Sequence, residues 1–313
     1  MNSSTLTSKL WLLLYFVVLL CSVGVGWIYT KHFEPETRFW VDAFRERRGE
    51  IRESRDGRRV IFSGDSACSF GINPQLFQKE TGLKTYNLGG TRQMGMEVFM
   101  SEALKHAREN DMLVLICNPA LLATEADQES LPKAGGRMEL ALSNEVTAGE
   151  FVDATRPGFN HLVSLGAKVA LRKPMFRYSA EDRRPLGQVV TSLRDHPRAS
   201  LREFEMEERL PKMVSVLDSW QKRCAQQGVS LYFLLPVELT DASILEENRQ
   251  KKGELLDELE KQLPQVKVLR TELLACSDDD SLFADTLFHL TEEAAADLTR
   301  RLVPLVEEAM KEE

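Results

Sequence analysis

The sequence predicts an α/β protein: a three-layer α/β/α sandwich with a mostly parallel, doubly wound sheet, preceded by one N-terminal transmembrane helix. Short apolar strands alternate with helical segments, a pattern typical of right-handed βαβ units with helices on both faces. Polar residues follow several of these strands, and in a parallel sheet such residues gather at the carboxyl edge. An uncharged run of twenty residues near the N-terminus predicts the transmembrane helix.

The composition excludes several classes of protein. The chain has 313 residues, of which 43% are hydrophobic and 28% are charged, and a formal net charge of −8. These values are typical of a globular protein and exclude a disordered chain or a polytopic membrane protein. Because 48 acidic residues outnumber 40 basic ones, a nucleic-acid partner is not expected. The five scattered cysteines exclude a small disulfide scaffold.

The run from Leu10 to Tyr29 contains no charged residue. At about 1.5 Å per residue, a helix of this length spans about 30 Å, the thickness of the hydrocarbon core of a bilayer. Trp11 and Trp27 lie near its two ends, where the headgroup region favours aromatic side chains. We interpret residues 1–9 as a short N-terminal tail and residues 10–29 as an uncleaved anchor. A cleaved signal peptide is the more serious alternative, and a buried core helix is the other.

The basic residues on the two sides of the anchor indicate its orientation. Lys9 and the terminal amine precede the anchor, whereas five basic side chains follow it closely: Lys31, Arg38, Arg45, Arg47 and Arg48. By the positive-inside rule, this distribution leaves the large domain in the cytoplasm.

Residues 30–58 resemble a charged membrane-proximal stalk, in which residues 39–44 can form a short amphipathic helix. An α/β domain is expected at residues 59–313. Its apolar runs predict strands at 60–62, 85–88, 112–117, 229–235 and 266–269, and its longer periodic segments predict helices at 97–108, 203–227, 246–262 and 292–310. Residues from about 120 to 200 have weak periodicity and many glycines and prolines, so we interpret them as a variable insertion.

Three residues fit a nucleophilic triad. Ser66 follows the first strand, and a serine hydroxyl needs a base to become a good nucleophile. Histidine is the usual base for a serine, and His289, on a loop before the last helix, is the candidate. Asp285 precedes it by four residues and can fix its tautomer.

An acyl-transfer intermediate also needs hydrogen-bond donors for its oxyanion. The candidates are the N–H groups of Ser66 and of Gly89 or Gly90, which follow the second strand, and the side chain of Asn118 after the third strand. Asn118 fits equally well as a cap or turn residue before Pro119. Asp65 is expected to brace the turn rather than enter the chemistry.

Two segments resemble the SGNH/GDSL hydrolase superfamily. Gly64-Asp65-Ser66, followed by Phe70-Gly71-Ile72, resembles its first block, and Asp285-Thr-Leu-Phe-His289-Leu-Thr resembles its last. The resemblance covers roughly residues 59–119 and 229–310, and it implies a flavodoxin-like SGNH fold with the Ser66, His289 and Asp285 roles given above. Two positions depart from the family pattern: Arg92 stands where the donor glycine is usual, and Cys117-Asn118-Pro119 replaces Gly-x-Asn-Asp.

The N-terminal anchor together with this ending is similar to membrane-anchored bacterial polysaccharide O-acyltransferases and esterases. That similarity implies a carbohydrate or acylated envelope polymer as substrate, a membrane-bound O-acyltransferase as partner, and a single-pass protein of the bacterial inner membrane. It also implies a periplasmic or extracellular domain, which the basic residues contradict, so the cytoplasmic orientation stays open.

We therefore expect a serine esterase or O-acyltransferase that works through a covalent acyl-Ser66. The alternative is a non-catalytic SGNH-like binding or scaffold protein that partners a membrane-bound O-acyltransferase. No cofactor and no metal ion are expected. Cys68 and Cys117 are expected to be buried thiols rather than a disulfide, and His106 is expected to be solvated.

Overall fold

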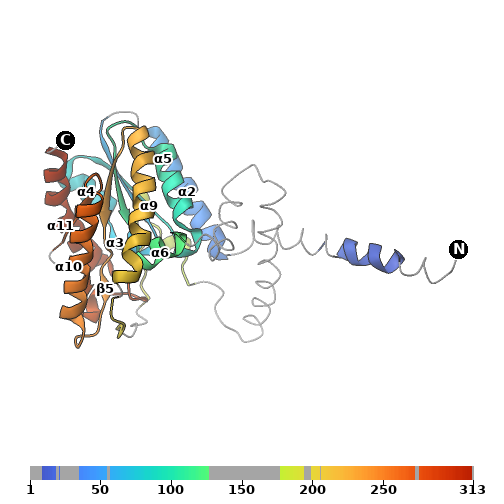
Figure 1. Cartoon of the computed structure of the whole chain (residues 1–313). Coiled ribbons are helices and arrows are strands. Elements are labelled where there is room, and N and C mark those ends of the chain that lie inside the picture. Colours follow the sequence, from blue (N-terminus) through green and yellow to red (C-terminus); the bar gives the residue numbers. More distant parts are fainter. Residues whose placement is uncertain are drawn as a thin grey trace. The chain divides into compact units, whose positions relative to one another are not determined.

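The computed structural model describes residues 9–18, 21, 35–54, 57–126, 177–193, 199–204, 206–271 and 275–311. It confirms the predicted α/β class: a parallel five-stranded sheet has helices on both sides (Figure 1). The sheet strands are β1 (Arg59–Gly64), β2 (Lys84–Gly89), β3 (Met112–Ile116), β4 (Ser230–Leu234) and β6 (Lys267–Leu269). All five were predicted, with bounds that differ by one or two residues.

The strand order is β2-β1-β3-β4-β6, and every neighbouring pair is parallel. The chain thus moves from β1 to one side for β2 and to the other side for the later strands, which is the doubly wound arrangement. Gly64 at the end of β1 pairs with Gly89 on β2 and with Ile116 on β3. The segments that follow these three strands therefore begin side by side, at the point where the order reverses.

Both faces of the sheet are buried. Every residue of β1 and β3 is buried, as expected for parallel strands between two layers of helices. Alternate strand residues, such as Phe62 and Val114, form one core with α4 (Pro74–Thr81) and α11 (Glu292–Lys311). Three more helices pack on strands of the sheet: α5 (Met96–His106) on β1, α9 (Met206–Gln226) on β4, and α10 (Leu245–Gln262) on β6.

Shorter elements complete the described chain. They are the helices α3 (Ser66–Gly71) and α6 (Pro119–Ala126), the 3₁₀ turns Arg92–Met94, Ala180–Asp182, Pro185–Gly187 and Asp280–Leu282, and a small parallel pair of strands, β5 (Glu238–Leu239) and β7 (Cys276–Ser277). The sequence did not predict α3, α4 or the β5–β7 pair, because each is short and carries little periodic signal.

The predicted stalk is wrong for residues 42–53. Helix α2 spans Pro35–Glu53, and from Asp42 onward it belongs to the same compact unit as the sheet. Phe44, Arg47 and Ile51 are buried in that unit. They follow one another at helical spacing, and Arg45 and Glu46 between them are exposed. That exposed charge made the segment look like a solvated stalk.

The predicted anchor and the predicted insertion lie largely outside the described residues. Of residues 10–29, only 10–18 and 21 are described, and of residues 120–200, only 120–126, 177–193 and 199–200. Across the part of the chain that the structure covers, no helix has the length and apolar character needed to cross a bilayer. The anchor therefore stays a prediction.

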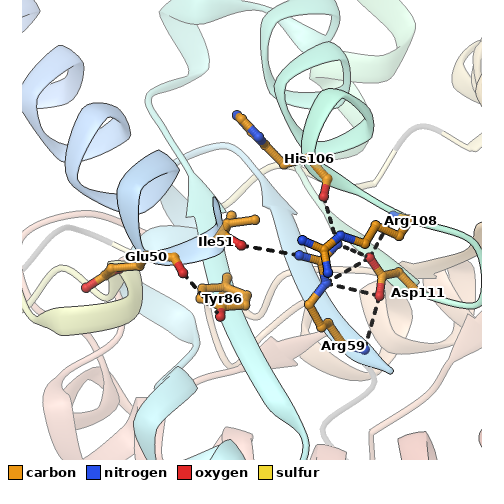
Figure 2. A network of polar contacts seen from close by, with 7 residues as sticks. All are labelled: Glu50, Ile51, Arg59, Tyr86, His106, Arg108 and Asp111. Atoms are coloured by element: carbon orange, nitrogen blue, oxygen red, sulfur yellow. Dashed lines mark hydrogen bonds and ion pairs between the residues drawn. The ribbon is translucent and has the colours of Figure 1, made fainter. Parts of the chain in front are cut away.

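A buried ion pair joins the amino ends of β1 and β3 (Figure 2). Arg59 is fully buried, and its guanidinium donates to both carboxylate oxygens of Asp111. It also donates to the carbonyl oxygens of His106 at 2.7 Å and of Ile51 at 3.4 Å. A buried charge is tolerated only when its donors are satisfied in this way. Contrary to expectation, His106, whose carbonyl belongs to this network, is buried, and the residue is only 9% exposed.

Candidate functional site

Ser66 is the first residue of α3, directly after the turn that ends β1. The turn is tight because β1 ends against β3: a Cβ on Gly64 would lie 1.7 Å from the carbonyl oxygen of Ile116, and the φ of Gly64 is +152°. Only glycine fits there. The side chain of Asp65 then accepts a hydrogen bond from the N–H of Ala67 at 2.9 Å and caps the helix. Ser66 is left half-buried at the carboxyl edge of the sheet.

Asp65 joins two turns at this edge. Its second carboxylate oxygen accepts a hydrogen bond from the N–H of Asn118 at 3.2 Å, so the turn after β1 is fixed to the turn after β3. The side chain is buried, and burial raises the pKa of Asp65; the hydrogen bonds from Asn118 and Ala67 and the charges of His289 and Arg92 oppose that shift. The expectation that Asp65 braces the turn is confirmed.

Asp285 and His289 lie together as the sequence predicts. Nδ1 of His289 is 2.9 Å from Oδ1 of Asp285, and the two side chains are only 8% and 2% exposed, respectively. A buried imidazole with a carboxylate on Nδ1 has one preferred tautomer, which leaves Nε2 as an acceptor.

A tight hairpin creates this pair. Phe283 and Leu290 form an antiparallel bridge, which closes the loop around the two side chains. Within the loop, Oγ1 of Thr286 accepts a hydrogen bond from the N–H of His289 at 3.1 Å. The N–H of Leu239 on β5 donates to the carbonyl of Leu287 at 2.9 Å and holds the hairpin against the β5–β7 pair.

The imidazole of His289 stacks on the phenyl ring of Phe70. The ring centroids are 4.0 Å apart and the ring planes differ by 11°. Phe70 comes four residues after Ser66 in α3, so the two side chains lie on the same face of that helix. His289, near the end of the chain, thus lies over the face of α3 that carries Ser66 and Phe70.

The Ser66 hydroxyl makes no hydrogen bond to any residue that the structure describes, His289 included. Contacts between a nucleophile and its base are often loose without substrate, and they shorten when substrate binds. The structure therefore brings Ser66 and the Asp285–His289 pair to one edge without closing the bond between hydroxyl and imidazole.

The two glycine N–H groups expected at an oxyanion site have partners within the fold. The N–H of Gly89 donates to Oδ1 of Asn87 at 2.9 Å, and the N–H of Gly90 donates to the carbonyl of Gly64 at 2.9 Å. Asn87 is fully buried and also donates to the carbonyls of Cys68 and Ile72. In this arrangement neither glycine N–H is available to an oxyanion, and Asn87 has a structural role.

The structure shows one of the two roles that the sequence left open for Asn118. Its Oδ1 accepts a hydrogen bond from the N–H of Ala120 at 2.8 Å, so the side chain caps α6. Its Nδ2 has no hydrogen-bond partner in the described part of the chain. The cap is therefore observed, and one amide donor of a half-buried side chain is left over at the carboxyl edge.

Arg47 contributes to this edge, although the sequence reading placed it in the stalk. It is 2% exposed, and its guanidinium donates to the carbonyl of Gly89 and, at 2.8 Å, to the carbonyl of Gly187. Burial lowers the pKa of Arg47 to about 10. Because both acceptors are backbone carbonyls, no sequence motif could have indicated these contacts.

Cys68 and Cys117 are buried thiols and do not form a disulfide with each other, as expected. The thiol of Cys68 donates to Oδ1 of Asn87 at 3.3 Å, and burial raises the pKa of Cys68 above its ordinary range. Neither property is that of a reactive nucleophile, so Ser66 is the candidate nucleophile at this edge.

Comparison of the sequence with protein-family models and with curated proteins found no match.

Proposed function

We propose that the chain is a serine esterase or O-acyltransferase with an SGNH-type site, which acts on acyl groups of a carbohydrate or cell-envelope polymer. One observation carries the proposal: the Asp285–His289 pair, joined at 2.9 Å, is stacked over the helix that begins with Ser66. The doubly wound strand order is compatible with an SGNH fold and supports this assignment.

In the proposed reaction, Oγ of Ser66 attacks the ester carbonyl while Nε2 of His289 takes the hydroxyl proton. Asp285 holds the other ring nitrogen and stabilises the imidazolium. The bond to the leaving alcohol then breaks, and His289 gives that alcohol its proton, which leaves acyl-Ser66. Water or an acceptor hydroxyl next attacks the acyl group and passes its proton to His289, and His289 returns that proton to Oγ of Ser66 as the acyl–serine bond breaks. The proposed oxyanion donors are the N–H of Ser66 and Nδ2 of Asn118.

The decisive experiment compares Ser66→Ala with Ser69→Ala in the full chain. Both serines belong to α3, but Ser69 is fully buried and has no part in the proposed chemistry. We expect a fluorophosphonate probe to label the wild type and Ser69→Ala, and not to label Ser66→Ala. Acetyl-ester turnover should follow the same pattern. Equal labelling and turnover of all three proteins would eliminate the mechanism.

A second candidate function is a non-catalytic binding or scaffold protein that partners a membrane-bound O-acyltransferase. The internal hydrogen bonds of the Gly89 and Gly90 N–H groups favour it, because they leave the oxyanion site with fewer donors. It predicts that the wild-type chain itself neither reacts with the probe nor hydrolyses acetyl esters.

We further propose that residues 10–29 anchor the protein in a bacterial inner membrane, with the α/β domain in the periplasm or outside the cell. The uncharged run supports the anchor, whereas the basic residues after it favour a cytoplasmic domain. A single reporter cysteine at the exposed position Glu293 separates the two orientations, since the native thiols of the domain are buried. A membrane-impermeant maleimide should label Glu293→Cys in intact cells with a permeable outer membrane only if the domain is outside the cytoplasm.

A further inference from the structure

We propose that Phe70 is a positioning residue for His289: its ring sets the plane of the imidazole and so aims Nε2 at the Ser66 hydroxyl. The inference rests on the proposed function and deepens it. The observation behind it is the parallel stack of the two rings, with centroids 4.0 Å apart and planes 11° apart.

The hydrogen bond to Asp285 alone does not fix the direction of Nε2. It holds one atom of the ring, Nδ1, at 2.9 Å from the carboxylate, and the imidazole can still tilt about that contact. A flat ring packed on one face removes this tilt. The two contacts together therefore determine both where the imidazole lies and which way its second nitrogen points.

Phe70 is suited to this role because it is itself held rigidly. Its side chain is fully buried, and α3, which carries it, packs against α11. Buried side chains in close-packed interiors occupy one rotamer and transmit displacement to their neighbours. A change of shape at position 70 should therefore move the imidazole.

Helix α3 also carries the nucleophile. Ser66 and Phe70 are one helical turn apart, so their separation is set by helix geometry alone. The stack on Phe70 thereby fixes the position of His289 relative to α3, the six-residue helix that also carries Ser66. Ser66 and His289 are nevertheless far apart in the sequence. Reactions that depend on such alignment are sensitive to small errors: a displacement of about 1 Å can cost about 100-fold in rate.

The test compares three variants of the full chain. Phe70→Leu removes the ring but keeps an apolar side chain, and Phe70→Tyr keeps the ring. Phe77→Leu is the matched control, because Phe77 is equally buried and packs edge-to-face on Phe62, with ring centroids 5.4 Å apart. Fluorophosphonate labelling of Ser66, kcat and KM for an acetyl ester, and NMR spectra of ¹³C-histidine-labelled protein are measured for each. The chain has only five histidines, so the His289 signal can be assigned with His289→Asn.

We expect Phe70→Leu to lower kcat and the labelling rate by about 10- to 100-fold with little change in KM. The His289 ring protons should also lose the upfield shift that a stacked phenyl ring causes. Phe70→Tyr should retain the shift and restore most of kcat. Phe77→Leu should lower the melting temperature while leaving the His289 signal, the labelling rate and kcat at wild-type values.

Two failures can be told apart. If the wild type reacts and Phe70→Leu reacts at the same rate after losing the ring-current shift, the positioning role is wrong and the proposed function stands. If the wild type neither labels nor turns over, the proposed function fails, and the positioning role fails with it.

Discussion

The carboxylate of Asp65 accepts hydrogen bonds from the N–H of Ala67 at 2.9 Å and from the N–H of Asn118 at 3.2 Å. One buried side chain thus holds the turn after β1, which carries Ser66, against the turn after β3. Asp65 precedes Ser66 in the chain, and Asn118 carries the amide proposed as an oxyanion donor. The relative position of these two groups therefore depends on Asp65.

Replacement of Asp65 should destabilise the fold, because both hydrogen bonds to its carboxylate are lost. Asp65→Ala removes a helix cap and leaves the N–H of Asn118 without an acceptor, so we expect the free energy of unfolding to fall by about 2–4 kcal/mol. Asp65→Asn retains one acceptor oxygen and should lose about half as much. Denaturant titration measures both, and Asp279→Ala, an exposed aspartate that caps a 3₁₀ turn, is the control. Equal stability of Asp65→Ala and wild type would contradict the bracing role.

The difference in stability between the wild type and Asp65→Asn should change with pH in a definite direction. Burial raises the pKa of Asp65 in the folded protein, so the folded state binds the Asp65 proton more tightly than the unfolded state does. The contribution of this group to stability is therefore present below its unfolded pKa, about pH 4, and is lost as the pH rises through the folded pKa. We expect the stability of the wild type, relative to Asp65→Asn, to decrease as the pH is raised from about 4 and then to level off. If the stability difference instead increased as the pH was raised from about 4, folding would lower the pKa of Asp65 rather than raise it.

Arg47 should stabilise the fold through the two carbonyls that it contacts. Arg47→Met leaves the carbonyl oxygens of Gly89 and Gly187 without this donor, and hydrogen bonds from a charged group are worth about 1.5–3 kcal/mol each. We expect a loss of about 2–5 kcal/mol by denaturant titration. Arg45→Met is the control from the same helix: Arg45 is exposed and lies 3.7 Å from Asp42, so its loss should change stability by less than about 0.5 kcal/mol. Similar values for the two variants would show that the buried contacts contribute nothing.

The sheet could be predicted from the sequence because its strands are continuous apolar runs. Ser66 and Asn118 follow two of these strands, and the parallel topology alone places them at the same edge of the sheet. Helix α2 was predicted only as a short helix at residues 39–44, because charged residues outnumber apolar ones in the part that follows. The Asp285–His289 pair was predictable from spacing. The partners of Gly89 and Gly90 were not, because a backbone N–H leaves no trace in the sequence of where it points. The stack of Phe70 on His289 was not predictable either, because it joins two side chains that are far apart in the sequence.

The role proposed for Asp285 predicts a specific kinetic defect. Asp285→Asn keeps the shape of the pair, but its amide favours the tautomer of His289 with the wrong nitrogen protonated. In serine triads this change lowers kcat by about 10⁴-fold, and we expect a decrease of about 10³- to 10⁴-fold here with KM nearly unchanged. The circular dichroism spectrum should match that of the wild type. Asp278→Asn, an exposed neighbour in the sequence, is the control, and retention of more than about a tenth of wild-type kcat by Asp285→Asn would remove Asp285 from the mechanism.

The ion pair of Arg59 and Asp111 should be costly to break from one side only. Asp111→Ala leaves the guanidinium of Arg59 buried without its carboxylate, and such a change typically costs about 3–5 kcal/mol. The matched control is Asp257→Ala, which removes an exposed carboxylate that lies 2.7 Å from the half-buried guanidinium of Arg270; we expect a loss below about 1 kcal/mol there. Because Arg59 and Asp111 lie at the amino ends of their strands, opposite the edge that carries Ser66, Asp111→Ala that remains folded should label with fluorophosphonate as fast as the wild type. Slower labelling of the folded fraction would show that the two edges of the sheet are coupled, which the arrangement of these contacts does not predict.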